Sequence, residues 1–242
     1  MTDNLMDRFL EELGKELKNK PTLPVGDPSV DRLPVVFVID HSDSTRESGD
    51  IVQINEFLKR FADSVCHATN EGWKRIRQHL DFCIVGYSEG AAEVLGWTPG
   101  SELSAPKIPT LVGSGRTAMG AGLELASNAM MRRLADYRAR SLPCYRGYIF
   151  NITDGNPTDM APADGADASS KWSRIKRVLD SFETKSSTGT AYAQTFHMAS
   201  RKANRELLGL LAFDPSRVID LEQANFDELF EFIRVSLLMT FE

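Results

Sequence analysis

Cysteine and histidine are scarce in this chain of 242 residues, which contains three cysteines and four histidines. The cysteines stand far apart and include no C-x-x-C pair: Cys66, Cys83 and Cys144. Their number and spacing exclude a disulfide framework and a thiolate zinc site, and are typical of buried thiols in a reducing compartment. No histidine stands with serine and aspartate in a pattern that indicates a nucleophilic hydrolase.

Long apolar runs and an excess of positive charge are also missing. No segment approaches the roughly 20 apolar residues that a membrane-spanning helix needs. The start of the chain, MTDNLMDRFLEELGKELKNK, is charged throughout, which is unlike a signal peptide. The 28 Lys and Arg residues against 34 Asp and Glu give a net charge of −6, which argues against nucleic acid as a partner. We therefore expect a cytoplasmic protein that binds neither membranes nor nucleic acid.

Helix and strand patterns alternate along most of the chain. Apolar runs predict strands at residues 34–40, 80–87, 91–97, 147–154, 190–199 and 217–221. Apolar residues at helical spacing predict helices at 3–19, 51–67, 169–182, 204–212, 225–239 and within 113–140. This alternation predicts an α/β fold with a doubly wound, mostly parallel, Rossmann-like central sheet, helices on both of its faces and one short antiparallel edge strand.

The chain divides into two regions. Residues 1–33 are predicted to form an amphipathic helix followed by a proline-rich linker, and residues 34–242 to form the α/β domain. Four prolines in 21–34 prevent that segment from being a helix or a central strand. The apolar stripe of the first helix must be buried, so we expect this helix to pack back onto the domain or onto another copy of the chain.

Oxygen-bearing side chains follow three of the predicted elements. The strand VVFVID ends in Asp40, and Ser42 and Ser44 come at alternate positions after it. Thr117 lies in the glycine-rich stretch GSGRT where a helix begins, and Asp154 ends the strand of GYIFNITDG. Ligands of doubly wound sheets bind at the carboxyl ends of the strands, so we expect these residues to come together. Two carboxylates and three hydroxyls suit a hard divalent cation, with Mg²⁺ as the natural candidate.

This set, D-x-S-x-S followed by a threonine in a glycine-rich loop and an aspartate in a T-D-G turn, resembles the metal-ion-dependent adhesion site of von Willebrand factor A (vWA) domains. The resemblance extends from the first predicted strand to the closing helix. It implies that Ser42, Ser44 and Thr117 contact Mg²⁺ or Mn²⁺ directly, while Asp40 and Asp154 act through water or support the hydroxyls. It also implies a protein-binding module, not an enzyme, in which a partner protein supplies an acidic residue to the metal.

A narrower resemblance concerns the stretches GSGRTAMGAGL and ITDGNPTD. They are similar to bacterial cytoplasmic vWA proteins that are linked to tellurite resistance and stress response. This similarity implies a kinase, a phosphatase or an ATPase as the partner. Two alternatives are a vWA subunit of an AAA+ ATPase or chelatase machine, and a metal-dependent phosphatase. In phosphatases whose first strand ends in a nucleophilic aspartate, a second aspartate two residues further on is the general acid. Ser42 occupies that place and cannot serve as the acid, which argues against the phosphatase alternative.

Two departures from simple patterns affect this interpretation. Asp43 stands between the serines, where the family usually has glycine, and it would raise the affinity for metal, compete with the partner's acid, or face solvent. The pattern Gly113-x-Gly115-x-x-Ala118 matches a dinucleotide fingerprint, but the preceding SAPKIPTLV contains two prolines and makes a poor central strand. We interpret these glycines as allowing the backbone to approach a metal.

Overall fold

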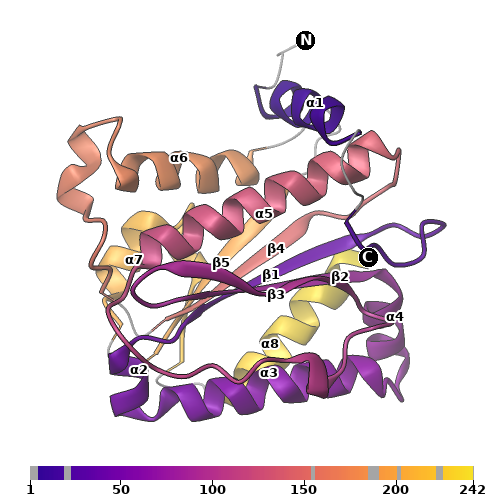
Figure 1. Cartoon of the computed structure of the whole chain (residues 1–242), viewed down its shortest axis with the longest axis horizontal. Coiled ribbons are helices and arrows are strands. Elements are labelled where there is room, and N and C mark those ends of the chain that lie inside the picture. Colours follow the sequence, from indigo (N-terminus) through magenta and orange to yellow (C-terminus); the bar gives the residue numbers. More distant parts are fainter. Residues whose placement is uncertain are drawn as a thin grey trace.

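A six-stranded sheet forms the centre of the molecule. The computed structural model describes residues 5–18, 23–153, 156–184, 191–200, 203–221 and 226–241. The strands are β1 (Leu33–Asp40), β2 (Leu80–Tyr87), β3 (Ala91–Pro99), β4 (Gly147–Thr153), β5 (Ala193–Ala199) and β6 (Val218–Asp220). They lie in the order β3-β2-β1-β4-β5-β6, and only β2 and β3 pair antiparallel (Figure 1). The order reverses at β1, which has β2 on one side and β4 on the other, so a ligand site is expected at the carboxyl ends of β1 and β4.

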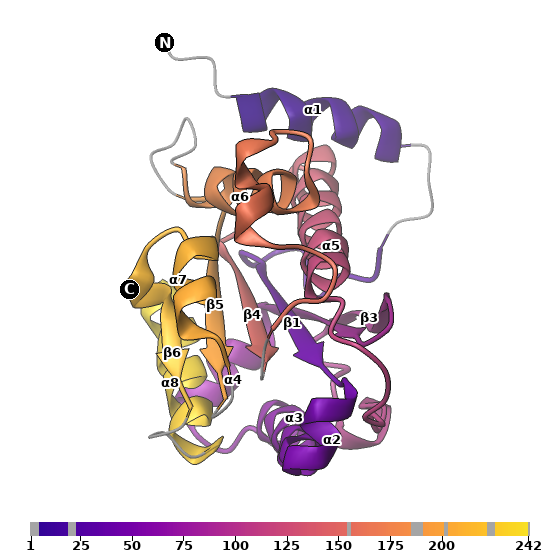
Figure 2. The ribbon, with the colours of Figure 1, turned by 90° about the vertical axis from the view of Figure 1, so that its left-hand side faces the viewer.

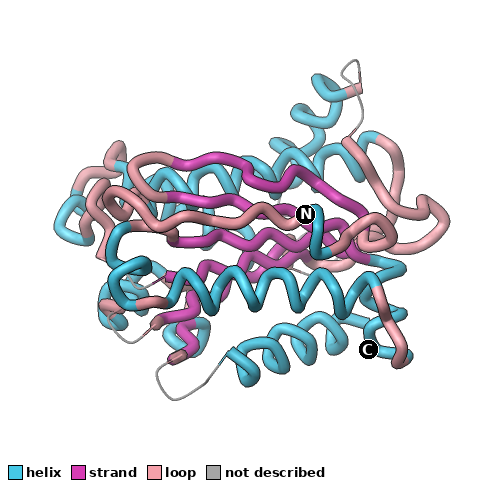
Figure 3. The backbone as a smooth tube through the Cα atoms, turned by 60° about the horizontal axis from the view of Figure 1, so that its bottom comes forward, coloured by secondary structure: helices cyan, strands magenta, loops and turns pink. Residues whose placement is uncertain are grey.

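Helices cover both faces of the sheet (Figure 3). They are α1 (Leu5–Leu17), α2 (Asp43–Ser48), α3 (Asp50–Cys66), α4 (Glu71–His79), α5 (Met119–Ala139), α6 (Lys171–Glu183), α7 (Arg205–Leu211) and α8 (Phe226–Leu238). Apolar residues of α5, α6 and α7 form one core with the sheet, and those of α3, α4 and α8 form a second core on the other face. The prediction of a doubly wound α/β fold is confirmed.

The side chains of β1 alternate between the two cores, because successive residues of a strand point to opposite faces. Val36 and Val38 face the core under α5, whereas alternate residues from Leu33 to Ile39 face the core under α3. Phe37 packs among aromatic rings of β2 and α3. Burial on both faces explains why this strand is a continuous apolar run in the sequence.

Helix α1 packs on α5, outside the helical layer (Figure 2). Met6 and Leu10 are buried in the core on this side of the sheet. Gly14 lies so close to α5 that an added Cβ would be 3.2 Å from the carbonyl oxygen of Ala135. The apolar stripe of α1 is therefore buried on its own chain, one of the two outcomes expected from the sequence. The division of the chain between residues 33 and 34 stays a prediction.

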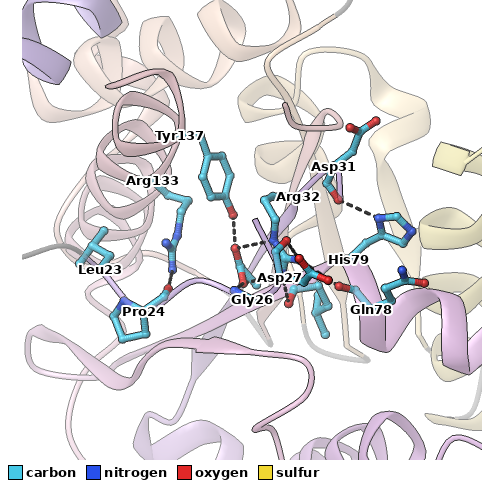
Figure 4. A network of polar contacts seen from close by, with 12 residues as sticks. Leu23, Pro24, Gly26, Asp27, Asp31, Arg32, Gln78, His79, Arg133 and Tyr137 are labelled. Atoms are coloured by element: carbon cyan, nitrogen blue, oxygen red, sulfur yellow. Dashed lines mark hydrogen bonds and ion pairs between the residues drawn. The ribbon is translucent and has the colours of Figure 1, made fainter. Parts of the chain in front are cut away.

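A buried ion pair fastens the linker to the amino end of β2. The guanidinium of Arg32 donates to Oδ1 and Oδ2 of Asp81 at 2.8 and 3.2 Å, and both side chains are fully buried. The hydroxyl of Tyr137, from α5, donates to the same carboxylate at 2.5 Å. Figure 4 shows Arg32 and Tyr137 converging from the linker and from α5. The described part of the linker is thus a packed part of the domain, at the opposite end of the sheet from Asp40.

Several local features differ from the sequence prediction. The edge strand β3 has nine residues and is not short, because its last residues continue to pair with the start of β2. Residues 43–48 form a short helix where we expected a loop. Helix α4 was not predicted, since only Trp73 and Ile76 on it are buried and its apolar pattern is weak. Cys144 is exposed, whereas we expected a buried thiol.

In the described part of the chain, no helix is both long and apolar enough to cross a bilayer.

Candidate metal site

Asp40 is the last residue of β1, and its side chain is fully buried. Its Oδ1 accepts a hydrogen bond from the backbone N–H of Ser42 at 3.0 Å, and its Oδ2 accepts one from the hydroxyl of Thr153 at 3.0 Å. Thr153 ends β4, the strand that pairs with β1 where the order reverses. Asp40 therefore joins two strand ends, and donors from both hold its buried carboxylate.

Ser42 and Ser44 bring two hydroxyls together just after β1. Their Oγ atoms lie 3.0 Å apart. Ser42 occupies the N-cap position of α2 in an extended backbone conformation, but its side chain makes no capping hydrogen bond. Serine is common at helix starts because its hydroxyl caps the first turn. The hydroxyl of Ser42 instead forms a hydrogen bond with that of Ser44.

The glycine-rich loop, residues 111–118, carries Thr117 to the same end of the sheet. Hydrogen bonds of 2.9 Å join its backbone to the carbonyl of His41 and to the backbone N–H of Asp43. Gly115 has a φ of +74°, and an added Cβ there would lie 2.6 Å from the side chain of Glu89, so this position favours glycine. Thr117 follows two residues later and is buried. The loop is thus fixed against the segment that carries the two serines.

Asp159 is a site residue that sequence reasoning missed. Its carboxylate accepts the backbone N–H groups of Gly120 and Ala121 at 2.9 Å each, and Lys171 donates to it at 2.9 Å. The N-cap residue of α5 is an alanine without a capping side chain, so Asp159 supplies the missing acceptor. The residue before Asp159 donates its N–H to the carbonyl of Thr117 at 2.9 Å. An acid that caps a helix 39 residues away leaves no local pattern in the sequence.

The two residues that alternate with the predicted ligands are engaged elsewhere. Asp43 forms an ion pair of 2.8 Å with Arg46, and both side chains are about half exposed or more, at 49% and 59%. Of the roles considered for Asp43, the structure favours the solvent-facing one. His41 places Nδ1 3.0 Å from the carbonyl of Val112, which requires a proton on that nitrogen. His41 therefore links the end of β1 to the glycine-rich loop.

The fifth predicted ligand, Asp154, lies outside the described residues. The structure brings Asp40, Ser42 and Ser44 into contact and holds Thr117 in a loop that is hydrogen-bonded to the same segment. Within the described part of the chain, no three side chains of His, Cys, Asp or Glu gather in a way that would hold a metal. A cation at this end of the sheet would therefore depend on hydroxyl oxygens as ligands.

A buried polar row lies beside this site, on the face of the sheet covered by α5 and α6. The hydroxyl of Tyr87 donates to Oδ1 of Asn151 at 3.4 Å, and Nδ2 of Asn151 donates to Nδ1 of His197 at 3.1 Å. Burial, assisted by the positive charge of Lys176, lowers the pKa of His197 to about 4. The imidazole is therefore neutral near pH 7 and adds no positive charge to the row.

The match to a family model identifies the class of protein. The model of the von Willebrand factor type A domain matches residues 35–233. Since this match spans most of the chain, the protein belongs to the vWA family. Domains of this family commonly mediate protein interactions. No curated protein matches the chain.

Solved structures with the same fold include the vWF domain of the type V pili tip protein Mfa5 from Porphyromonas gingivalis. It is 14% identical, with a TM-score of 0.53, and the match covers 90% of this chain and 97% of that chain. The pilus adhesin SpaC from Lactobacillus rhamnosus GG is 14% identical, with a TM-score of 0.60 and coverage of 90% and 32%. Proximal thread matrix protein 1 from the mussel byssus, with a zinc-occupied MIDAS motif, is 16% identical, with a TM-score of 0.51 and coverage of 90% and 49%. At these identities the likeness shows the fold alone.

Proposed function

We propose that Asp40, Ser42, Ser44, Thr117 and Asp154 bind one divalent cation, Mg²⁺ or Mn²⁺, at the carboxyl ends of β1 and β4. The observation that carries this proposal is the pair of serine hydroxyls, 3.0 Å apart beside a fully buried carboxylate. Hydroxyl and carboxylate oxygens are the ligands that a hard cation prefers. The zinc-occupied motif of the mussel protein supports a site of the same kind in this chain.

The bound metal would supply an electrophilic centre that accepts a carboxylate oxygen from a partner protein. Ser42, Ser44 and Thr117 would hold the cation directly. Asp40 already accepts two hydrogen bonds, which suits a carboxylate that orients a ligand or a bound water. With +2 from the metal and −2 from Asp40 and Asp154, the centre is neutral and can accept an external acid. We therefore propose that the protein is a protein-binding module and not an enzyme.

The setting of this module is a further part of the proposal. The stretches GSGRTAMGAGL and ITDGNPTD support a cytoplasmic protein of a bacterial stress-response or tellurite-resistance system, with a kinase, a phosphatase or an ATPase as partner. The second candidate is a vWA subunit of an AAA+ ATPase or chelatase machine, which would use the same metal face to bind the motor. Mass spectrometry of proteins retained by the chain in Mg²⁺ and released by EDTA separates these two settings.

Isothermal titration calorimetry with Mg²⁺ and with Mn²⁺ tests the metal site. We expect Asp40→Asn and Ser42→Ala to weaken metal binding by at least about tenfold, because each removes or neutralises an oxygen ligand or its support. Ser101→Ala removes an exposed hydroxyl beyond β3 and should bind metal as the wild type does. Circular dichroism melting confirms that each variant is folded. Wild-type affinity in both site variants would show that the metal, if bound, lies elsewhere.

A turnover assay separates the binding module from the phosphatase alternative. The wild-type chain is incubated with a generic phosphate ester in Mg²⁺ or Mn²⁺, with Asp40→Asn as the control. We expect no turnover above that of the variant. Metal-dependent hydrolysis that Asp40→Asn abolishes would establish catalysis and contradict the proposal.

A further inference from the structure

Three side chains of the glycine-rich loop, Val112, Ser114 and Arg116, are exposed at alternate positions. Val112 is 72% exposed, more than any other large hydrophobic residue in the described part of the chain. The residues between them are buried or half-buried, and Thr117 follows directly. One side of the loop thus faces solvent, next to the proposed metal ligand.

The backbone of this exposed loop is held at nearly every step. Asn55 of α3 donates to the carbonyl of Leu111 and accepts its N–H, both at 2.9 Å. His41 binds the carbonyl of Val112 at 3.0 Å, and a glutamate of the β2–β3 turn accepts the N–H of Arg116 at 3.2 Å. These contacts come in addition to the backbone hydrogen bonds from the end of β1. A loop fixed in this way loses little conformational freedom when a partner binds, so its side chains are preorganised for contact.

Arg116 is an exposed cation on this surface. Its guanidinium forms no ion pair in the described part of the chain, whereas the nearby Arg46 is neutralised by Asp43. An exposed guanidinium one residue before a proposed metal ligand is complementary to a second acid on a partner whose first carboxylate binds the metal. Val112, four residues before Arg116, offers exposed apolar area on the same loop.

We propose that the glycine-rich loop is a second contact for the partner and selects its sequence, an inference that rests on the proposed function. The fitting partner is an extended acidic segment of a protein. One of its carboxylates binds the metal, a second acid pairs with Arg116, and an aliphatic side chain packs on Val112. At roughly 3.3 Å per extended residue, the span from 112 to 116 corresponds to at most about five residues of such a segment.

Selection from a displayed library of random linear peptides tests this inference. The full chain is the bait in Mg²⁺, and bound peptides are eluted with EDTA. We expect the wild-type pool to be enriched in two nearby acids and an aliphatic residue. Arg116→Glu should remove the preference for the second acid, and Val112→Asp the preference for the aliphatic residue. Matched controls are Arg132→Glu on α5 and Val52→Asp on α3, which are an exposed arginine without a partner in the described part of the chain and a 58% exposed valine.

A synthetic peptide from the wild-type pool then gives affinities. We expect a loss of about three- to tenfold in Arg116→Glu and in Val112→Asp, and wild-type affinity for both peptide and Mg²⁺ in the two controls. EDTA-sensitive acidic peptides whose preferences are the same in all variants would overturn the second contact while leaving the proposed function intact. A wild-type pool with no acid enriched, or none eluted by EDTA, would overturn both.

Discussion

Single residues at the end of β1 divide into those that contact one another and those that contact the surroundings. Asp40, Ser42 and Ser44 form a connected set, while His41 binds the glycine-rich loop and Asp43 pairs with Arg46 on the solvent side. His41 and Ser42 lie between the end of β1 and the start of α2, and Asp43 and Ser44 begin α2, so the change from strand to helix places these side chains on different sides. Asp43 is therefore a surface charge, whose effect on a metal would be screened by water and weakened by its arginine.

His197 provides a prediction of pH dependence. Its pKa is lowered to about 4 from an ordinary value of 6.5, mainly by burial and further by the charge of Lys176. The unfolded chain therefore takes up a proton before the folded chain does as the pH falls. The stabilising effect of the neutral imidazole is complete above about pH 6.5 and is lost as the pH falls toward 4. Neutral Nδ1 also accepts from Asn151, a bond that protonation would break.

The measurement is urea denaturation at about pH 7.5 and about pH 4.5. We expect the wild type to lose about 3 kcal/mol more than His197→Gln between these conditions, because the variant has no group to titrate at this place. His67→Gln, which removes an exposed histidine at the end of α3, should follow the wild type. Parallel curves for the wild type and His197→Gln would show that His197 is not held neutral by the fold.

At the scale of elements, the start of α5 depends on a side chain from the loop after β4. Asp159 accepts two N–H groups of the first turn, from Gly120 and Ala121, and its own position is fixed by Lys171. A Cβ on Gly120 would lie 3.0 Å from both carboxylate oxygens and 2.8 Å from the side chain of Lys171, so this cap needs a glycine inside the helix. The cap fastens the segment before α6 to the start of α5, just after Thr117.

We expect Asp159→Ala to lower the free energy of unfolding by about 1–2 kcal/mol, because two N–H groups of α5 lose their acceptor. Lys171→Ala removes only a partly exposed ion pair and should cost less than about 1 kcal/mol. Denaturation measures both values, and calorimetry with Mg²⁺ should show weaker binding for Asp159→Ala, since the start of α5 positions Thr117. Equal effects of the two variants on stability would contradict the role of Asp159 as a helix cap.

At the scale of the whole molecule, charge is buried at both ends of the sheet for different reasons. At the carboxyl ends, Asp40 is held by neutral donors and has the proposed metal beside it. At the amino ends, Asp81 is paired with Arg32 of the linker and with the hydroxyl of Tyr137, whose pKa is raised by burial and by this carboxylate. The second arrangement is complete without a ligand and ties the linker, β2 and α5 together.

Asp81→Asn is expected to lower the free energy of unfolding by about 3–5 kcal/mol, because Arg32 would keep a buried charge without its partner. Glu71→Gln breaks the exposed pair with Lys74 and should cost less than about 1 kcal/mol. Urea denaturation measures both. Metal binding of the folded Asp81→Asn variant should equal that of the wild type, since the two sites lie at opposite ends of the strands. A cost below 1 kcal/mol would show that the linker pair does not stabilise the domain.

The sequence by itself determined the elements with a strong periodic pattern. Strands buried on both faces appear as continuous apolar runs, and α3, α6 and α8 carry apolar stripes at helical spacing, so local composition suffices to predict them. It also placed Asp40, Ser42 and Ser44 at a strand end, and the parallel topology then brings such ends to one edge of the sheet. Their role as metal ligands, together with that of Asp154, stays a prediction.

Only the tertiary structure decided the features that rest on contacts between distant segments. The anchors of the glycine-rich loop come from Asn55 and His41, and the cap of α5 comes from Asp159, each far along the chain from the group it binds. Each of these hydrogen bonds depends on a single side chain at a single position. One residue creates no periodic pattern in the sequence, so such contacts cannot be predicted from it. The docking of α1 on α5 could not be predicted for a similar reason. An apolar stripe indicates that one face of a helix is buried, but it does not indicate which surface covers that face.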